Sequence, residues 1–381
     1  MFSKQNADEL QSRVIAFLRF PLIVGVVFIH NYRPSIIVGN EVMGSETHMP
    51  TYSFIGQLFS QYIGWISVPL FFFFSGFLFF YKADYSLQTY IYKIKRRIST
   101  LLIPYLFWNA SFLICFFAVS HLPLTRQWFQ FPNNAGLDYY LSSFWGILDD
   151  KKTMTYPIAY QFWFIRDLMV LSLFSPVLYC LLSRFKGLLI WLIAVFWLCG
   201  YSLPYIGIRG LSTEALFFFS LGAVFSIYKR NFVNIVRIYG YYPYIFYLLM
   251  VAVHYAFMVQ GHDVQWLFKL IKIAGILSTL NLSAAIVAKH NFRSTTFLAS
   301  ASFFVFAIHD PWLLSNIRKL LYVTLHPASD FAMVVVYFFN ILLTVTIALA
   351  LYYCLKKISP KFTAIITLSL IHISEPTRQE A

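Results

Sequence analysis

The chain has 381 residues, of which 59% are apolar and only 12% are Asp, Glu, Lys or Arg, whereas soluble domains carry about twice that charged fraction. This composition excludes a soluble globular enzyme, a disordered chain and a disulfide-rich secreted domain, and it predicts an all-α, polytopic membrane protein. The four cysteines are scattered in or beside apolar runs, without the spacing of metal ligands, so no metal site is predicted.

Ten apolar segments each come close to the roughly 20 residues that a helix needs to cross the hydrocarbon core of a bilayer. Because lipid offers no hydrogen-bond partner, each segment must satisfy its own backbone groups as a helix. No signal-peptide cleavage site follows the first segment, so we interpret it as a retained first helix. The ten helices of the predicted bundle lie at about 14–31, 64–81, 100–120, 161–183, 187–203, 211–228, 241–259, 267–288, 296–317 and 331–355.

Lysines and arginines are distributed unevenly between the two sets of alternate connections. The set that includes both termini holds 17 of them, and the opposite set holds 9 although its loops are longer. Because cytoplasmic loops carry the excess of Lys and Arg, we expect both termini in the cytoplasm. The net charge of +14 is therefore a topology signal, and no nucleic-acid partner is expected. The two longest outer loops are predicted at about 32–63 and 121–160.

The C-terminal stretch Leu368–Arg378 reads LSLIHISEPTR and resembles the conceptual translation of a sequencing-library adapter. We therefore expect an integral membrane domain at 1–360 and a non-native tail at 368–381. His372 and Glu375 accordingly carry no functional weight.

The first predicted helix carries two ionisable residues on one face. Arg19 and His30 are 11 residues apart, which at about 100° per residue returns them to within roughly 20° of one direction, about 16 Å apart along the axis. Ionisable groups inside a membrane span are costly and indicate function. On this face, the Arg19 guanidinium is able to bind an anion and the His30 imidazole is able to act as a base. The alternative is structural, with the arginine snorkelling to the interface and the histidine bonding a loop carbonyl.

A cluster of four cations precedes the third predicted helix. It consists of Lys93, Lys95, Arg96 and Arg97, on the side assigned to the cytoplasm. Guanidinium groups bind phosphate in bidentate geometry, so the cluster is a candidate site for a phosphate-rich ligand. A topology signal or a lipid-headgroup cluster is the alternative.

The ninth predicted helix contains the run Ser302-x6-His309-Asp310-Pro311. A His-Asp step followed by proline suggests a broken or terminating helix that lines a cavity. His309 is thus a second candidate catalytic residue, and Asp310 is a candidate substrate-binding residue. A purely structural pair is the alternative.

Three candidate substrate-binding residues, Trp163, Arg166 and Asp167, lie at the outer start of the fourth predicted helix. Arg166 and Asp167 are sequence neighbours and need not face each other, so pairing with other helices is an equal alternative.

Glu214 is the only glutamate in an apolar segment. It is a candidate to orient a catalytic histidine, or it pairs with Arg209. His254 and His121 are isolated, and we interpret both as structural.

Together these features resemble the acyltransferase-3 family of bacterial integral membrane acyltransferases, which includes O-antigen and exopolysaccharide O-acetyltransferases. The resemblance extends from about residue 13 to 355. It departs from the family pattern in two respects. No second arginine stands three positions after Arg97, so that Lys93 or Arg96 takes its place, and no fused C-terminal hydrolase-like domain of the kind found in some members is expected after the tenth helix. The motifs that carry the resemblance are Arg19-x10-His30, VPLFFFFSGFLFF from Val68, RR-x6-PYLFW from Arg96, FWFIRDL from Phe162, FFFSLG from Phe217 and Ser302-x6-His309.

The resemblance implies a multi-pass protein of the bacterial inner membrane that binds no resident cofactor. Its donor substrate is acyl-CoA, usually acetyl-CoA, on the cytoplasmic side, and its acceptor is a hydroxyl of a cell-envelope glycan or a lipid-linked precursor. Arg19 and the cation cluster then hold the CoA, and His30 acts as general base or as a transient acyl carrier. The alternatives are a transporter or flippase of a lipid-linked sugar or acyl group, and a non-catalytic partner in polysaccharide export.

Overall fold

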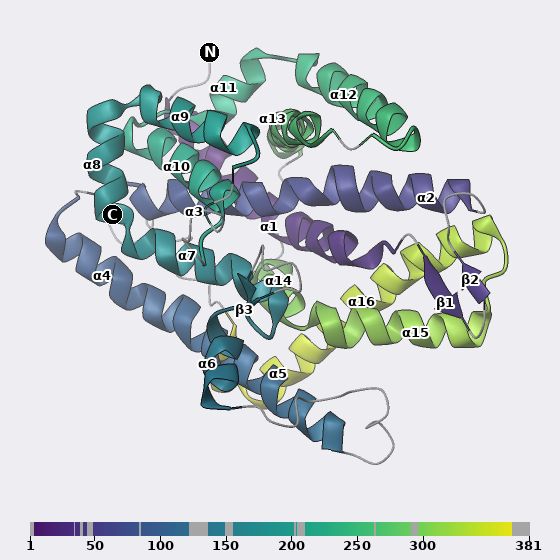
Figure 1. Ribbon diagram of the computed structural model, residues 1–381. Helices are drawn as coiled ribbons and strands as arrows, with labels where there is room; N and C mark the ends of the chain where they lie inside the picture. The colour runs from purple at the N-terminus through teal and green to yellow at the C-terminus, as the bar shows by residue number, and fades with distance from the viewer. Residues whose placement is uncertain are drawn as a thin grey trace. The chain divides into compact units, whose positions relative to one another are not determined.

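The computed structural model is built almost entirely of helices (Figure 1). The two described hairpins are minor, since each strand has only two or three residues. The structure describes residues 4–33, 35–38, 41–43, 49–83, 85–121, 136–148, 155–201, 203, 210–262, 264–290 and 296–367.

Seven helical segments in the described part of the chain are long and apolar enough to cross a bilayer. An eighth is made by Tyr160–Leu173 and Ser175–Phe185, if these two helices, bent by 66°, form one span. Two more apolar helices, Gly187–Leu198 and Thr213–Ile227, have 12 and 15 residues, or about 18 and 22 Å, which is shorter than the roughly 30 Å hydrocarbon core. The all-α membrane fold is confirmed, whereas ten spans and the orientation of the termini stay predictions.

Two boundaries predicted from hydropathy are wrong. The second span begins at Pro50 rather than near residue 64, and the helix that contains the third begins at Leu87 rather than near residue 100. The first error arises because Ser53, Gln57 and Ser60 are polar but buried inside the protein, so that hydropathy reads them as a loop. The second arises because Leu87–Arg97 is an amphipathic helix whose charges conceal its continuity with the apolar segment.

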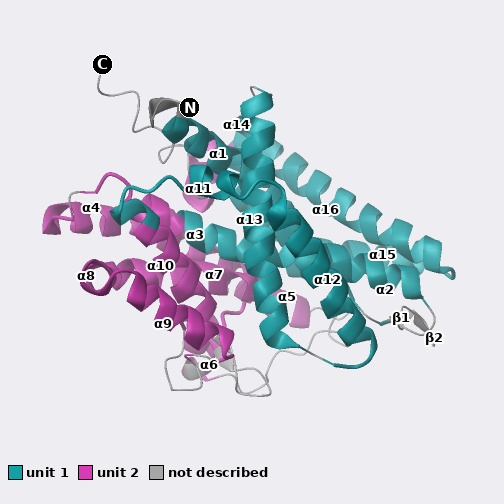
Figure 2. Cartoon of the chain, turned by 90° about the horizontal axis from the view of Figure 1, so that it is seen from above, with its two compact units in different colours: residues 1–74, 225–358 teal, residues 75–224, 359–381 magenta. Residues whose placement is uncertain are grey.

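The described chain divides into two compact units, and the first comprises residues 1–74 and 225–358 (Figure 2). Helix α1 (Lys4–Asn31) is central to it, because it packs against α13, α14, α16 and the helical turn Gly64–Ile66. Gly25 permits the close approach of α1 to the residue that follows this turn, since a Cβ there would overlap the Ser67 hydroxyl.

Helices α15 (Leu314–Leu325) and α16 (Asp330–Ile358) of this unit lie side by side in Figure 1. The other elements of the first unit follow α1 in chain order. They are β1 (Ile36–Val38), β2 (Glu41–Met43), α2 (Pro50–Gly56), a π-helical segment (Gln57–Ile63), the 3-10 turn Gly64–Ile66, the start of α3 (Ser67–Phe80), the end of α10 (Thr213–Ile227), α11 (Phe232–Ile238), α12 (Tyr242–Val259), α13 (Gln265–Lys289), α14 (Thr296–Ile308), a second π-helical segment (His309–Leu313), α15 (Leu314–Leu325) and α16 (Asp330–Ile358).

The second unit comprises residues 75–224 and 359–381 (Figure 2), and the predicted tail 368–381 lies outside the described residues. The end of α3 packs closely on α10 at Gly76, where a Cβ would overlap the Phe219 carbonyl. The remaining elements of this unit are α4 (Leu87–Arg97), a π-helical segment (Ile98–Leu102), α5 (Ile103–His121), α6 (Leu137–Trp145), β3 (Ile147–Leu148), β4 (Thr155–Tyr156), the 3-10 turn Tyr160–Phe162, α7 (Trp163–Leu173), α8 (Ser175–Phe185), α9 (Gly187–Leu198) and α17 (Pro360–Ile366).

Candidate active site

Two histidines from distant parts of the sequence meet in the first unit. His30 lies in the last turn of α1, and His309 begins the π-helical segment between α14 and α15. Their ring centroids are 5.3 Å apart, and the ring planes are inclined by 40°. The structure thus brings together the two histidines that the sequence nominated separately.

The hydrogen bonds of His309 leave one ring nitrogen available. Nδ1 lies 2.6 Å from the Phe306 carbonyl oxygen, which only accepts, so Nδ1 carries the proton of the neutral ring. Nε2 is buried, and no described residue offers it a hydrogen bond. A neutral imidazole with a free Nε2 lone pair is able to accept a proton or a hydrogen bond from a reacting group.

Asp310 interrupts the helix directly after His309. Its backbone angles, φ −142° and ψ 150°, are extended rather than helical, so the predicted break in this helix is confirmed. The Ser315 hydroxyl donates a hydrogen bond of 2.6 Å to the Asp310 carboxylate. The carboxylate is buried close enough for its charge to act on both His30 and His309.

Arg318 of α15 holds the C-terminal end of α1, a role that the sequence analysis missed. Its guanidinium donates to the carbonyl oxygens of His30 and Asn31, at 3.4 and 3.0 Å, and to the Ser315 hydroxyl at 3.4 Å. A cation that donates to the last carbonyls of a helix satisfies groups that lack partners within the helix. The sequence showed Arg318 only as one of the few basic residues in an outer connection.

Asn31 anchors the same end of α1 to α16. Its side-chain amide donates to the Tyr337 carbonyl at 2.9 Å, and its Oδ1 accepts from Asn340 at 2.6 Å. Asn340 also donates to the Leu314 carbonyl at 3.3 Å. The four residues in these contacts are buried, so His30 projects from a helix end whose position is fixed on two sides.

Arg19 lies on α1, half-buried, 11 residues before His30. No described residue forms a hydrogen bond or an ion pair with its guanidinium. The cation is therefore available to an anionic group, as its predicted role requires.

The predicted phosphate-binding cations lie in the second unit on two faces of α4. The Lys93 ammonium and the Arg97 guanidinium stand over the Phe79 ring, at 5.2 and 5.5 Å from its centroid, and Lys93 also donates to the Phe79 carbonyl. Arg96 instead stands over Tyr92, 5.8 Å from that ring, and Lys95 is exposed. Residues four apart share a helix face, so Lys93 is the cation that accompanies Arg97.

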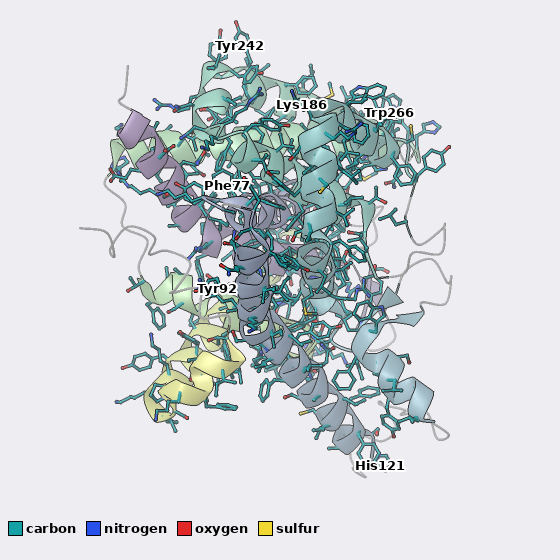
Figure 3. All side chains as sticks on the ribbon, turned by 90° about the vertical axis from the view of Figure 1, so that its left-hand side faces the viewer. Phe77, Tyr92, His121, Lys186, Tyr242 and Trp266 are labelled. Carbon is teal, nitrogen blue, oxygen red and sulfur yellow. The ribbon has the colours of Figure 1, made fainter. Side chains whose placement is uncertain are left out.

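Tyr92 lies on the exposed side of α4, and His121 ends α5 in the same continuous helical segment (Figure 3). The His121 Nδ1 donates to the Phe117 carbonyl at 2.9 Å, as expected of a structural histidine.

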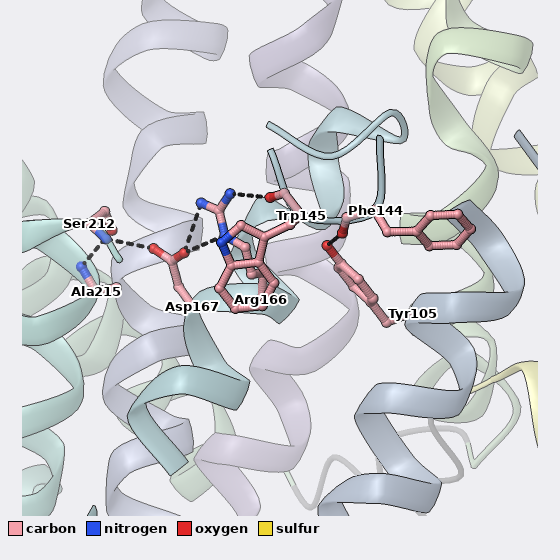
Figure 4. A network of polar contacts seen from close by, with 7 residues as sticks. All are labelled: Tyr105, Phe144, Trp145, Arg166, Asp167, Ser212 and Ala215. Carbon is pink, nitrogen blue, oxygen red and sulfur yellow. Dashed lines mark hydrogen bonds and ion pairs between the residues drawn. The ribbon is translucent and has the colours of Figure 1, made fainter. Parts of the chain in front are cut away.

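Arg166 and Asp167 form a buried ion pair with each other, 3.1 Å from Nη2 to Oδ1 (Figure 4). Arg166 also donates to the Trp145 carbonyl at 2.8 Å, and Asp167 accepts from the Ser212 backbone at 2.8 Å. The pair therefore links α7 to the end of α6 and to the residue before α10. These contacts correspond to the structural alternative, and the predicted substrate role of the two residues stays a prediction.

Trp163 and Glu214 occupy helix starts in the second unit. Trp163 is the first residue of α7, and Glu214 lies in the first turn of α10, where a carboxylate is stabilised by the helix dipole. Both side chains are half-buried. Arg209, the alternative partner of Glu214, lies outside the described residues.

The described residues contain no group of three His, Cys, Asp or Glu side chains that is able to hold a metal ion.

Comparisons with known proteins agree on the kind of protein. The model of a family described as an acyltransferase domain, acyltransferase-3, matches residues 14–353. The chain is 26% identical over 375 residues to the succinoglycan biosynthesis protein ExoH of Rhizobium meliloti (strain 1021), across 94% of this chain and 93% of that protein. No solved structure matches the chain.

Proposed function

Because this chain belongs to the acyltransferase-3 family, we propose that it transfers an acyl group, acetyl in the simplest case, from acyl-CoA to a sugar hydroxyl. The acceptor is a cell-surface polysaccharide or its lipid-linked precursor. A relative named for the biosynthesis of succinoglycan supports a glycan as acceptor. The observation that carries the proposal is the pair formed by His30 and His309, with ring centroids 5.3 Å apart.

His30 acts as general base in this proposal. It takes the proton of the sugar hydroxyl while the hydroxyl oxygen forms a bond to the thioester carbonyl carbon. The carbon–sulfur bond then breaks, and the proton is passed to the departing thiolate, which yields the sugar ester and free CoA. In a two-step variant, an imidazole nitrogen first takes the acyl group while the carbon–sulfur bond breaks and CoA leaves. The sugar hydroxyl then attacks the acyl-imidazole, the acyl–nitrogen bond breaks, and the hydroxyl proton passes to the released imidazole.

His309, Asp310 and Arg318 assist His30. His309 presents the Nε2 lone pair described above, which suits it to orient His30 or the sugar hydroxyl. The buried Asp310 carboxylate stabilises an imidazolium when one of the rings takes up the proton. Arg318 holds the backbone from which His30 projects, so it is a positioning residue.

The donor is held by cations on the side that we assign to the cytoplasm. Lys93 and Arg97, which share one face of α4, bind phosphate groups of the CoA, and Lys93 takes the place of the missing second arginine. The positive charges of Arg96 and Lys95, on other faces of α4, also attract the acyl-CoA. The available guanidinium of Arg19 donates to a further anionic or carbonyl oxygen of the donor. The protein is multi-pass in the inner membrane, with both termini in the cytoplasm.

Trp163, Arg166 and Asp167 serve the sugar in this proposal. Trp163 offers a ring for stacking, while Arg166 and Asp167 shape the region around it through the contacts that link α7 to the end of α6 and to the residue before α10.

Mass spectrometry of glycan O-acetylation tests the proposal in cells that carry His30→Ala in place of the wild-type chain. We expect O-acetylation to be lost at normal protein abundance, whereas the exposed control His326→Ala retains it. Full acetylation in the His30→Ala cells would remove His30 from the chemistry. Turnover of acetyl-CoA by the purified protein separates an acyltransferase from a transporter, because a transporter releases no CoA.

A further inference from the structure

A cavity of about 700 Å³ opens within the first unit, a size in the range of small-molecule pockets. It extends from Tyr32, two residues beyond His30, to α12 and the first half of α13. Neither the catalytic roles nor the donor site proposed above uses its other lining residues.

Two lysines from one face of α13 give the cavity a positive floor. Lys269 and Lys272 are three residues apart, and Lys272 is only 6% exposed. The Lys272 ammonium stands 4.6 Å from the Trp65 ring centroid and 5.3 Å from that of Phe268. An ammonium that lies largely buried among aromatic rings attracts an anionic group, because the low local dielectric strengthens their interaction.

Amides and aromatic rings complete the lining. Gln57, Gln61 and Trp65 follow one another at intervals of four on one helical stripe, and Gln265 faces the cavity from the start of α13. A primary amide both donates and accepts hydrogen bonds, which matches sugar hydroxyls. An indole ring offers an apolar face to the carbon–hydrogen face of a sugar ring.

The floor also contains a paired histidine. The His254 Nδ1 and the Tyr62 hydroxyl are 2.9 Å apart, and His254 is buried whereas the rim residues Gly261 and His262 are exposed. The isolated histidine that the sequence analysis took as structural thus borders this cavity.

We propose that this cavity binds an acidic sugar of the acceptor glycan, with the anionic group at Lys269 and Lys272 and the sugar ring on Trp65. The inference rests on the proposed function, and it adds that the acceptor carries a carboxylate or phosphate group near the acylated residue. An anionic lipid headgroup would satisfy the two lysines equally well. The three glutamines favour the sugar, because they provide hydrogen-bond partners for several hydroxyl groups.

Binding of an acidic glycan without any acyl donor tests the proposal. The probes are an oligogalacturonate and its carboxyl-reduced, neutral counterpart, titrated against the full-length protein in nanodiscs of phosphatidylcholine. The variants are Lys272→Gln and Trp65→Phe, with Lys289→Gln as matched control, because Lys289 is an exposed lysine at the far end of the same helix. Size-exclusion profiles and melting temperatures establish that each variant is folded.

We expect the wild-type protein and Lys289→Gln to bind the acidic oligosaccharide equally well. Lys272→Gln should weaken that binding by about tenfold or more, since a hydrogen bond to a charged group is lost, and Trp65→Phe should weaken binding of both oligosaccharides. Equal affinity of the wild-type protein for the acidic and the neutral oligosaccharide would overturn the proposal, as would unchanged binding by a folded Lys272→Gln variant.

A second experiment distinguishes a lipid-binding site from a glycan-binding site. If the wild-type protein retains phosphatidylglycerol that Lys272→Gln loses, while glycan binding is the same in both, the cavity is a lipid site and the proposal is wrong. The acetyl-CoA turnover assay distinguishes a failure of this cavity assignment from a failure of the proposed function. Turnover without selective acidic binding refutes only this cavity assignment, whereas selective binding without turnover refutes the proposed function.

Discussion

The imidazole rings of His30 and His309 lie with centroids 5.3 Å apart, although one belongs to the first helix and the other to a break between two helices near the end of the chain. Arg318 and Asn31 fix the backbone on the His30 side, and the Phe306 carbonyl fixes the ring on the His309 side. Because both rings are held in place, substitutions around them should change the reaction rate differently from substitutions around an isolated catalytic histidine.

If the two histidines act as one unit, their contributions are not additive. We expect His30→Gln and His309→Gln each to lower kcat by about 10²- to 10⁴-fold, which is typical of general acid–base groups, and the double variant to be no slower than the slower single variant. Acetyl-CoA turnover by purified protein measures this, with the exposed His326→Gln as control. Multiplicative losses in the double variant would show that the rings act independently.

A histidine base gives the reaction a definite pH dependence. A protonated imidazole has no lone pair, so transfer should stay level over the pH range in which the ring is neutral and should slow at more acid pH, where the ring takes up a proton. Initial rates at saturating acetyl-CoA, recorded with protein of verified integrity at each pH, provide the measurement. A rate that increases toward acid would exclude a neutral imidazole as the base.

Arg318 should affect the chemical step without touching the donor. Replacing it by methionine removes the donors to the His30 and Asn31 carbonyls, so we expect kcat to fall by about tenfold while the KM for acetyl-CoA is unchanged. Arg318→Lys should restore part of the rate, because an ammonium still donates to one carbonyl. Lys319→Met, at the exposed neighbouring position, is the control. A rise in KM with normal kcat would assign Arg318 to donor binding instead.

The cations of α4 should differ in their effect on the donor. We expect Arg97→Gln and Lys93→Gln to raise the KM for acetyl-CoA by about tenfold, as the loss of a charge-assisted hydrogen bond to phosphate predicts, with a smaller change in kcat. Lys95→Gln removes the same charge from the exposed face and should raise this KM less, because Lys95 adds only general attraction. If all three variants behave alike, the cluster acts only through its total charge.

The ion pair formed by Arg166 and Asp167 should contribute to stability. Asp167→Asn leaves a buried guanidinium without its counter-charge, and breaking a buried pair in this way costs about 3–5 kcal/mol. We expect a clearly lower melting temperature in detergent, with Glu9→Gln as an exposed control. A variant with wild-type stability but impaired transfer would show that the pair serves the substrate.

The fold class and the main helices could be predicted from the sequence because membrane helices are selected for apolarity along their whole length. Hydropathy failed where polar side chains face the protein interior, as Gln57 does between Pro50 and Gly64. It also failed at Leu87–Arg97, whose charges lie on an amphipathic helix. Local composition does not distinguish a polar residue that faces a buried cavity from one in a loop.

The site was predictable only in part for a related reason. His30 and His309 could be nominated because an ionisable residue in an apolar run stands out. Arg318 and Asn31 could not, because their importance depends on backbone carbonyls that are brought near by tertiary packing. The contacts of Lys272 with aromatic rings are likewise invisible in the sequence, where the lysine is one basic residue near the start of a predicted span.

The close packing of α1 at Gly25 has a consequence for chain length. Inserting one residue between Arg19 and His30 would rotate His30 by about 100° around the helix axis and advance it by about 1.5 Å. Because Gly25 holds α1 against Ser67, the helix cannot turn to compensate, and the imidazole would leave His309. This segment should therefore accept changes of apolar side chain but neither insertions nor deletions, so its length is under a stricter constraint than its composition.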